Sequence, residues 1–239
     1  MALYGIKFNG KHSINDFDLY VAESDVSPAK KREYRAQVPY MNGSYDFSKL
    51  FGESTFDRRD LEYKFNVVGD DPEDLGDLKM RVAEWLMVPQ ETELIDDTTP
   101  NFHFLAECTE VDEDDDYEYS ELTAKFNADP FRYRNETMYN LLWDDIDFDH
   151  DYIIINEFTL TAGAETEISV YNNSIISIAP YITVTADITL VINGLSYSIS
   201  ECENATAAFT LSPGTNTIVV SGDYEEDQTL IIDWNEARL

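Results

Sequence analysis

The densest cluster of side chains that could do chemistry is the run Asp-Glu-Asp-Asp-Asp at residues 112–116. Its first, third and fifth residues are aspartates, as at the start of an EF-hand calcium loop. The rest of that pattern fails, because Tyr117 stands where the loop needs a glycine and Thr123 where it needs a glutamate. Since like charges repel one another and favour solvent, we predict that this run lies on a surface loop, with weak cation binding as the alternative.

Acid–base catalysis by paired carboxylates is the second chemistry that the composition suggests, since 48 of the 239 residues are acidic. A glycosidase needs one carboxyl group in an apolar pocket that raises its pKa, and neither 112–116 nor the second acidic cluster, 144–151, has such surroundings. His12, His103 and His150 lack the spacing of a metal site, and no G-x-S-x-G, P-loop or G-x-G-x-x-G motif occurs. We therefore predict no catalytic, cofactor-binding or metal-binding residue and expect a protein that is not an enzyme.

Aromatic side chains are the third candidate, with three Trp, fifteen Tyr and thirteen Phe. Core packing or a subunit interface explains them most simply, because Tyr and Trp are favoured in both. A carbohydrate-binding module in residues 136–239 is the alternative, and it requires exposed Trp or Tyr beside hydrogen-bonding groups. The tryptophans available to it are Trp143 and Trp234.

The charge of the chain limits its partners. The net charge is −32, of which residues 1–135 carry −15 and residues 136–239 carry −17, with Arg238 as the only basic residue of the second part. A nucleic-acid-binding surface must be basic to neutralise phosphates, so we predict no specific nucleic-acid partner. Passage of DNA through an acidic channel, without adhesion, is compatible with this charge.

Targeting signals and cysteine usage indicate a protein made in the cytosol. No apolar run approaches the roughly 18 residues that span a bilayer, and the first residues alternate like a strand and lack the regions of a signal peptide. Cys108 and Cys202 are too few for a disulfide framework, so we predict that both are small, buried apolar residues.

The first half of the chain reads as strands with one helix. Apolar residues alternate with polar ones in Leu-Glu-Tyr-Lys-Phe-Asn-Val at residues 61–67, as in a half-buried antiparallel strand. The predicted strands are 3–9, 17–22, 44–50, 61–68, 102–107 and 118–127. Asp71 and Pro72 are typical of a helix start, and apolar residues then recur at helical spacing as far as Leu86. We predict a helix at about 72–87 that packs on a sheet, and a turn at 96–101.

The second half changes to short β-branched strands separated by turns, beyond a domain boundary at about 135–140. Asn193-Gly194 is the strongest hairpin signal in the chain. The predicted strands are 152–160, 166–171, 181–185, 188–192, 195–200, 206–211, 215–221 and 228–234. Their regular spacing predicts a β-sandwich with no helix in residues 136–239.

Several motifs, taken in order, resemble the distal tail proteins of siphophages. Residues 6–13, Ile-Lys-Phe-Asn-Gly-Lys-His-Ser, and 17–21, Phe-Asp-Leu-Tyr-Val, are similar to the family's F-N-G-x-x-S and D-F-G-L. Residues 38–46, Val-Pro-Tyr-Met-Asn-Gly-Ser-Tyr-Asp, are similar to V-P-G-x-x-G-x-x-D, and 126–133, Phe-Asn-Ala-Asp-Pro-Phe-Arg-Tyr, to F-x-A-D-P-F/Y-x-Y. The chain departs from the family at two glycine positions, which hold Asp18 and Tyr40.

The resemblance implies a mainly β protein: an α+β, β-sandwich-like N-terminal domain with one helix at residues 1–135, and a galectin-like β-sandwich at 136–239. It also implies a structural role at the tail tip or baseplate of the virion. There the N-terminal domains would form a hexameric ring that joins the tail tube protein to the tail hub or tail-associated protein and supports receptor-binding proteins.

A long polar excursion at residues 24–60 and the exposed sheet edges of the first half are where we expect the homo-oligomer contact, because such edges can pair with a neighbour in a closed ring. The predicted contact residues are Val38, Pro39, Tyr40, Met41, Tyr45, Phe47 and Phe51.

Overall fold

The computed structural model describes residues 4–40, 42–48, 54–67, 72–115, 120–140, 155–200 and 209–239. The chain is mainly β, as predicted, and its strands form several antiparallel sheets. Contacts divide it into two compact units, one reaching Tyr133 and the other formed by Arg134–Arg238. Within the described residues, no helix is both long and apolar enough to cross a bilayer.

The N-terminal unit is built on one antiparallel sheet in the order β2-β1-β7-β8-β9-β6-β3. Its strands are β1 (Ile6–Phe8), β2 (Lys11–His12), β3 (Val21–Val26), β6 (Arg59–Val67), β7 (Thr92–Asp96), β8 (Phe102–Asp115) and β9 (Ser120–Arg134). Along β6, Leu61, Tyr63, Phe65 and Val67 are buried on one face, as the alternation predicted. This face carries the core of the unit.

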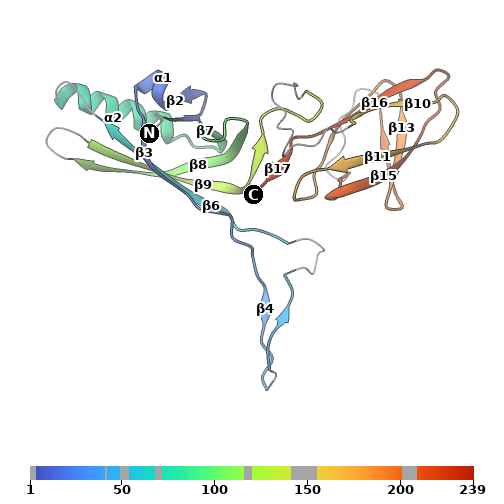
Figure 1. Cartoon of the computed structure of the whole chain (residues 1–239), viewed down its shortest axis with the longest axis horizontal. Coiled ribbons are helices and arrows are strands. Elements are labelled where there is room, and N and C mark those ends of the chain that lie inside the picture. Colours follow the sequence, from blue (N-terminus) through green and yellow to red (C-terminus); the bar gives the residue numbers. More distant parts are fainter. Residues whose placement is uncertain are drawn as a thin grey trace. The chain divides into compact units, whose positions relative to one another are not determined.

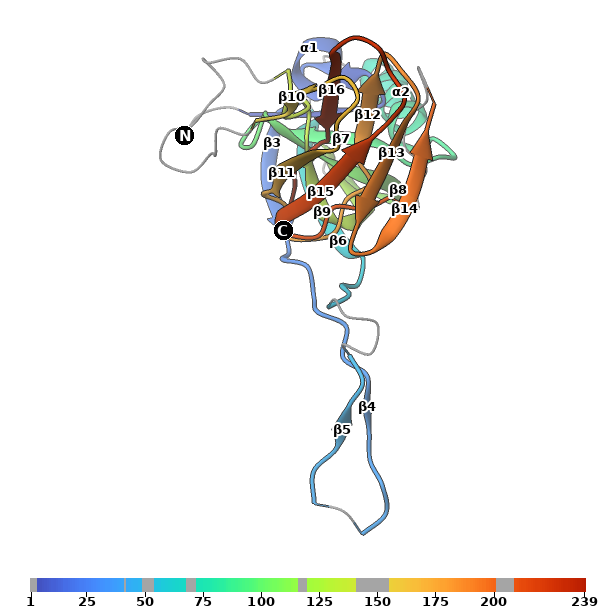
Figure 2. The same cartoon turned by 90° about the vertical axis from the view of Figure 1, so that its right-hand side faces the viewer.

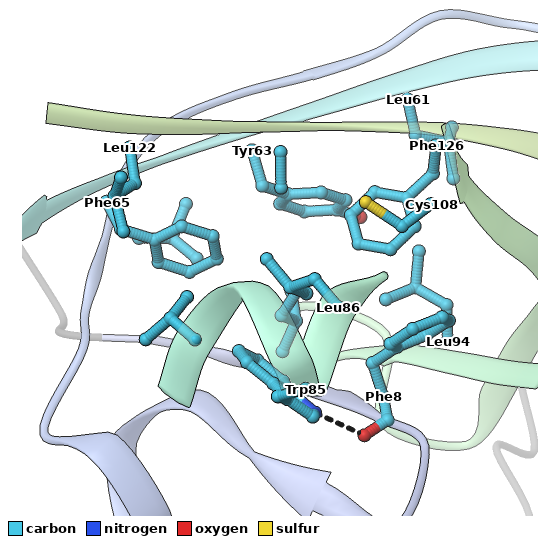
Figure 3. Packing of buried hydrophobic residues seen from close by; sticks show 14 of the residues in the cluster. Phe8, Leu61, Tyr63, Phe65, Trp85, Leu86, Leu94, Cys108, Leu122 and Phe126 are labelled. Carbon is cyan, nitrogen blue, oxygen red and sulfur yellow. Dashed lines mark hydrogen bonds between the residues drawn. The ribbon is translucent and has the colours of Figure 1, made fainter. Parts of the chain in front are cut away.

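Helix α2 (Pro72–Leu86) covers that face of the sheet (Figure 1). The prediction of a helix at 72–87 is confirmed, and its apolar stripe buries Val82, Trp85 and Leu86. Figure 3 shows Trp85 and Leu86 turned toward the aromatic residues of the sheet, with the Trp85 indole bonded to the Phe8 carbonyl. The predicted helix cap, Asp71, lies outside the described residues.

Two elements of this unit differ from the prediction. Residues Ser13–Phe17 form a short helix, α1, and the strand expected from residue 17 begins only at Val21. The side chain of His12 accepts a hydrogen bond from the Ile14 N–H and so caps the start of α1, and Asp18 ends it in a left-handed conformation with φ of 55°. Strand β7 was also not predicted, because its few residues carry too little alternation.

The acidic run is a strand, and its prediction as a loop is wrong. Strand β8 continues through residues 112–115, while residue 116 lies outside the described part. Lys125 on β9 donates hydrogen bonds to Asp112 at 2.5 Å and Glu110 at 2.9 Å, and Lys79 of α2 lies 3.4 Å from Glu113. These cations reduce the like-charge repulsion that favoured a loop.

The C-terminal unit consists of two antiparallel sheets that face each other (Figure 2). One contains β10 (Glu157–Leu160), β16 (Gln228–Asp233) and β12 (Tyr181–Val184), in that order. The other contains β11 (Thr166–Asn172), β15 (Gly214–Ser221), β13 (Ile188–Ile192) and β14 (Leu195–Ile199), and β17 (Ala237–Arg238) ends the chain. Their facing aliphatic residues form a separate core with Phe209 and Trp234.

The turn predicted at Asn193-Gly194 joins β13 to β14. Its two residues have φ of 52° and 78°, as a tight hairpin turn requires. The strand predicted at 206–211 is not formed in the part that is described: residues 206–208 lie outside it, and Leu211 makes only a single bridge with Ile178. Of the strand predicted at 152–160, Glu157–Leu160 is observed and 152–154 lie outside the described residues.

Candidate assembly surface

Residues 28–58 leave the N-terminal sheet between β3 and β6 and form what we call the arm. Strands β4 (Arg35–Ala36) and β5 (Tyr45–Asp46) pair within it, and it extends away from the sheet of its own unit (Figures 1 and 2). Next to these strands, the Phe47 N–H donates to the Tyr34 carbonyl at 2.8 Å, and the Tyr34 N–H donates to Ser48 Oγ at 2.8 Å.

The base of the arm is held by further cross-links between its two sides. The Arg32 N–H donates to the Thr55 carbonyl, and the Asp57 N–H donates to the Lys30 carbonyl, each at 2.8 Å. The Arg32 side chain also forms an ion pair of 2.6 Å with Asp57. The described parts of the arm are therefore paired at its base and at its strands, and none of its described residues belongs to the buried core.

The arm exposes large apolar side chains to solvent. Five of the fourteen exposed large hydrophobic residues among those described lie on it: Tyr34, Val38, Tyr40, Tyr45 and Phe47. The Tyr45 and Phe47 rings lie 6.2 Å apart. Exposed apolar residues gathered on one element are typical of a surface that another molecule covers.

The structure places five of the seven predicted contact residues on this arm. Val38, Pro39, Tyr40, Tyr45 and Phe47 are all exposed there, whereas the other two, Met41 and Phe51, lie outside the described residues. The prediction omitted Tyr34, which is 54% exposed. The only signal for Tyr34 was its place within the excursion at 24–60.

Both positions at which the chain lacks a family glycine adopt positive φ. Asp18 has φ of 55° and Tyr40 has φ of 67°. Non-glycine residues pay steric strain in this region, and aspartate tolerates it better than tyrosine does. These two positions therefore have the backbone conformation that favours glycine but carry other side chains, and the Tyr40 ring is exposed.

Charge also distinguishes the arm. It contains six basic and four acidic residues and so has a net charge of +2, while the other 208 residues contain ten basic and 44 acidic residues, a net charge of −34. Within it, hydrogen bonds from the hydroxyl and then the backbone N–H of Ser48 lower the pKa of Asp46. The arm is the part of the chain that an acidic surface attracts.

No metal-binding arrangement of His, Cys, Asp and Glu side chains occurs in the described residues. They contain no group of three or more His, Cys, Asp or Glu side chains placed to hold a metal ion. The Lys64 ammonium lowers the pKa of Glu23 by a hydrogen bond, and the pKa of Asp46 is also lowered, whereas a glycosidase acid needs a raised pKa. His12 contacts Asp97 at 3.1 Å, the His103 ring is tilted by 35° to the Tyr133 ring with centroids 6.0 Å apart, and His150 lies outside the described part.

Two surface hollows of the N-terminal unit are lined by charged residues of both signs. A hollow of about 470 Å³ is lined by Lys7, Asn9, Glu91 and Glu93, among others, and a second of 340 Å³ by Lys11, Asp16, Arg81 and Glu84 with the edges of aromatic rings. In each hollow, basic and acidic side chains of opposite charge lie together at the surface and are open to water.

The tryptophans do not form a sugar-binding platform in the described part of the C-terminal unit. Trp234 is fully buried, and its Nε1 donates to the Asn173 side chain at 3.4 Å. Trp143 lies outside the described residues. Cys108, predicted to be buried, is 4% exposed, and burial raises the pKa of its thiol to about 11; Cys202 lies outside the described residues.

Comparison with known proteins relates this fold and its arm to phage tails. Residues 11–128, which include the arm, match the family model of the phage tail protein RIFT-related domain. Over 100% of both chains, the fold is similar to the crystal structure of the distal tail protein of phage SPP1, with a TM-score of 0.65 and 14% identity. The chain carries the phage tail protein RIFT-related domain and has the fold of the SPP1 distal tail protein, in agreement with the siphophage distal tail resemblance. No curated protein sequence matches it.

The predicted family resemblance is thereby confirmed. The SPP1 protein is described as a paradigm of the hub adsorption apparatus in phages that infect Gram-positive hosts. The phage tail domain indicates a structural component of the virion tail.

Proposed function

We propose that this distal tail protein closes into a homo-oligomeric ring, with six copies as the family resemblance implies, and that the arm of each copy docks on the next. The observation that carries the proposal is the arm itself, which exposes Tyr34, Val38, Tyr40, Tyr45 and Phe47 without burying them in its own unit. Aromatic residues of this kind supply most of the binding energy at protein interfaces.

Charge complementarity supports the neighbour as the partner of the arm. Copies that each carry −32 repel one another, whereas a segment of net charge +2 is attracted to the acidic remainder of a second copy. The two copies need not use the same surface for this contact. A head-to-tail contact between the arm of one copy and another surface of the next generates a closed ring when the rotation that relates neighbouring copies closes the circle.

The ring would join the tail tube protein to the tail hub and support receptor-binding proteins, with the galectin-like C-terminal unit available for further contacts. Its acidic lumen would let DNA pass without adhesion. This role is structural and needs no active site, so we propose that the protein is not an enzyme and that it is made in the host cytosol before assembly.

Sedimentation velocity and negative-stain imaging of the purified full chain test the proposal. We expect a closed ring with a central channel. Tyr45→Ser should raise the protein concentration at which half of the chains are assembled (the assembly midpoint) by about tenfold or more. A tenfold rise is equivalent to about 1.4 kcal/mol.

Tyr181→Ser is the matched control, since Tyr181 is 53% exposed and Tyr45 is 55% exposed, but Tyr181 lies on β12 of the C-terminal unit. It should leave assembly unchanged. A chain that stays monomeric at high concentration, or rings that form equally well with Tyr45→Ser, would overturn the proposed contact.

A further inference from the structure

Two guanidinium groups face the same aromatic ring in the N-terminal sheet. The Cζ atoms of Arg59 on β6 and Arg132 on β9 each lie 4.9 Å from the centroid of the Phe104 ring on β8. The ring attracts each cation, but the two cations repel one another, and Arg132 contributes to lowering the pKa of Arg59 after the larger effect of burial. The juxtaposition favours an anion beside the pair.

The hydrogen bonds of the two arginines differ. Arg59 is 5% exposed, and its side chain donates to the carbonyls of Ser27 at 2.9 Å and Pro130 at 3.2 Å. Arg132 is half-buried, and its Nε is buried with no hydrogen-bond partner. Within the part of the chain that the structure describes, neither arginine forms an ion pair with a carboxylate. A buried charged donor without a partner is costly, and the described part of the chain supplies no acceptor to this one.

The pair lies at the root of the arm. Ser27 immediately precedes the arm and Arg59 immediately follows it, so the Arg59–Ser27 hydrogen bond ties the two ends of the arm together. Phe56, near the end of the arm, contacts Phe131 next to Arg132 with ring centroids 5.5 Å apart. A neighbour that receives or contacts the arm is therefore brought close to Arg132.

We propose that Arg59 and Arg132 form a carboxylate-binding site for an acidic side chain of a second copy of this chain. The inference rests on the proposed ring and deepens it by naming the chemistry of one contact. A guanidinium fork binds a carboxylate through two parallel hydrogen bonds, and a carboxylate beside the pair would offset the repulsion between the two arginines. Outside the arm the chain offers 44 acidic residues against ten basic ones, so a neighbouring copy supplies carboxylates readily.

Substitution of Arg132 in the full chain tests the site by sedimentation velocity and thermal unfolding. R132Q removes the charge, and R132K keeps the charge but loses the fork. R81Q is the control, because Arg81 lies on α2, outside the arm, and its guanidinium already sits over the Phe17 ring of its own chain. We expect the concentration at half-assembly to rise tenfold or more for R132Q, by less for R132K, and by under twofold for R81Q. The Tm of the dilute R132Q monomer should be unchanged or higher, because a buried unpartnered charge is lost.

Zero-length cross-linking identifies the bound group. A carbodiimide couples the amine introduced by R132K to a carboxylate in contact with it, and rings assembled from equal amounts of ¹⁴N- and ¹⁵N-labelled R132K chains distinguish cross-links between copies from those within one copy. We expect mixed-isotope cross-linked peptides that join position 132 to an aspartate or glutamate of another copy.

Three outcomes would overturn the site. The first is that R132Q assembles at the same concentration as the wild type. The second is that cross-links occur only within single copies. The third is that the monomer Tm of R132Q falls enough to explain the whole loss of assembly. The wild-type chain separates the two proposals: if it forms rings and R132Q does too, only the carboxylate site fails, whereas a wild-type monomer at all concentrations overturns the ring and the site together.

Discussion

The indole Nε1 of Trp85 donates a hydrogen bond of 2.7 Å to the backbone carbonyl of Phe8 (Figure 3). The contact joins the last turn of α2 to β1 across 77 positions of sequence. The Phe17 ring stacks on the same indole with centroids 4.8 Å apart. One side chain therefore holds the helix, the first strand and α1 together.

Loss of that hydrogen bond should destabilise the N-terminal unit. Trp85→Phe keeps an aromatic ring but leaves the Phe8 carbonyl without its donor, and we expect the free energy of unfolding to fall by about 1–3 kcal/mol. Denaturant unfolding followed by circular dichroism measures the change. Met80→Leu on the exposed face of α2 serves as the control, and equal stability of Trp85→Phe and this control would contradict the role of the bond.

The C-terminal unit contains a buried ion pair whose removal should be costly. Arg134 and Glu236 lie 3.0 Å apart with side chains 4% and 2% exposed, and Arg238 also contacts Glu236 at 2.6 Å. Arg134→Met leaves the Glu236 carboxylate buried with one partner fewer, and we expect a loss of about 3–5 kcal/mol.

Replacing both partners tests the cause of that loss. Arg134→Met combined with Glu236→Leu removes the stranded charge, so the double variant should be more stable than the sum of the single losses predicts. A denaturant-based double-mutant cycle measures the coupling, and additive losses would show that the two charges do not interact.

The buried thiol of Cys108 should resist modification in the folded protein. Burial raises its pKa to about 11, so little thiolate exists at pH 8, and the sulfur is almost inaccessible. With Cys202→Ser present to leave one cysteine, a chromogenic disulfide reagent should react with less than a tenth of the chains in the native state and with all of them in denaturant. Rapid native labelling would contradict the burial of this thiol within β8.

Tyr40 should matter for assembly and not for monomer stability. Tyr40→Gly relieves a left-handed conformation but adds freedom to the unfolded chain, and these effects oppose one another at about 1 kcal/mol each. We therefore expect a monomer Tm within a few degrees of wild type and an assembly midpoint raised about tenfold. Unchanged ring formation, measured by mass photometry, would remove Tyr40 from the contact.

Asp46 should titrate at unusually low pH. Because its hydrogen bonds from Ser48 favour the charged form, its pKa in the folded arm lies below the ordinary 3.8. Its contribution to the hairpin is complete above that ordinary value and is lost as pH falls through the lowered one. An NMR titration that follows the Ser48 amide measures the midpoint, with Asp46→Asn as the control that abolishes the transition. A midpoint at or above 3.8 would refute the interaction.

Local patterns determined the regular elements. The alternation of Leu61, Tyr63 and Phe65 predicted β6, and the helical spacing of Val82 and Trp85 predicted α2. Both predictions were possible because an element that buries one face places apolar residues at a regular spacing in the sequence. The family motifs, read in order, also indicated a siphophage distal tail protein, which is confirmed.

Tertiary contacts decided the rest. Residues 112–115 form a strand because Lys79 and Lys125, distant in sequence, lie against their charges, and α1 forms because His12 and Asp18 supply its ends. The pairing of Arg59 with Arg132 around Phe104 required three strands to meet in one sheet. The sequence shows which side chains a segment carries. Their energies also depend on neighbouring side chains from other segments, and only the fold determines which segments lie close together.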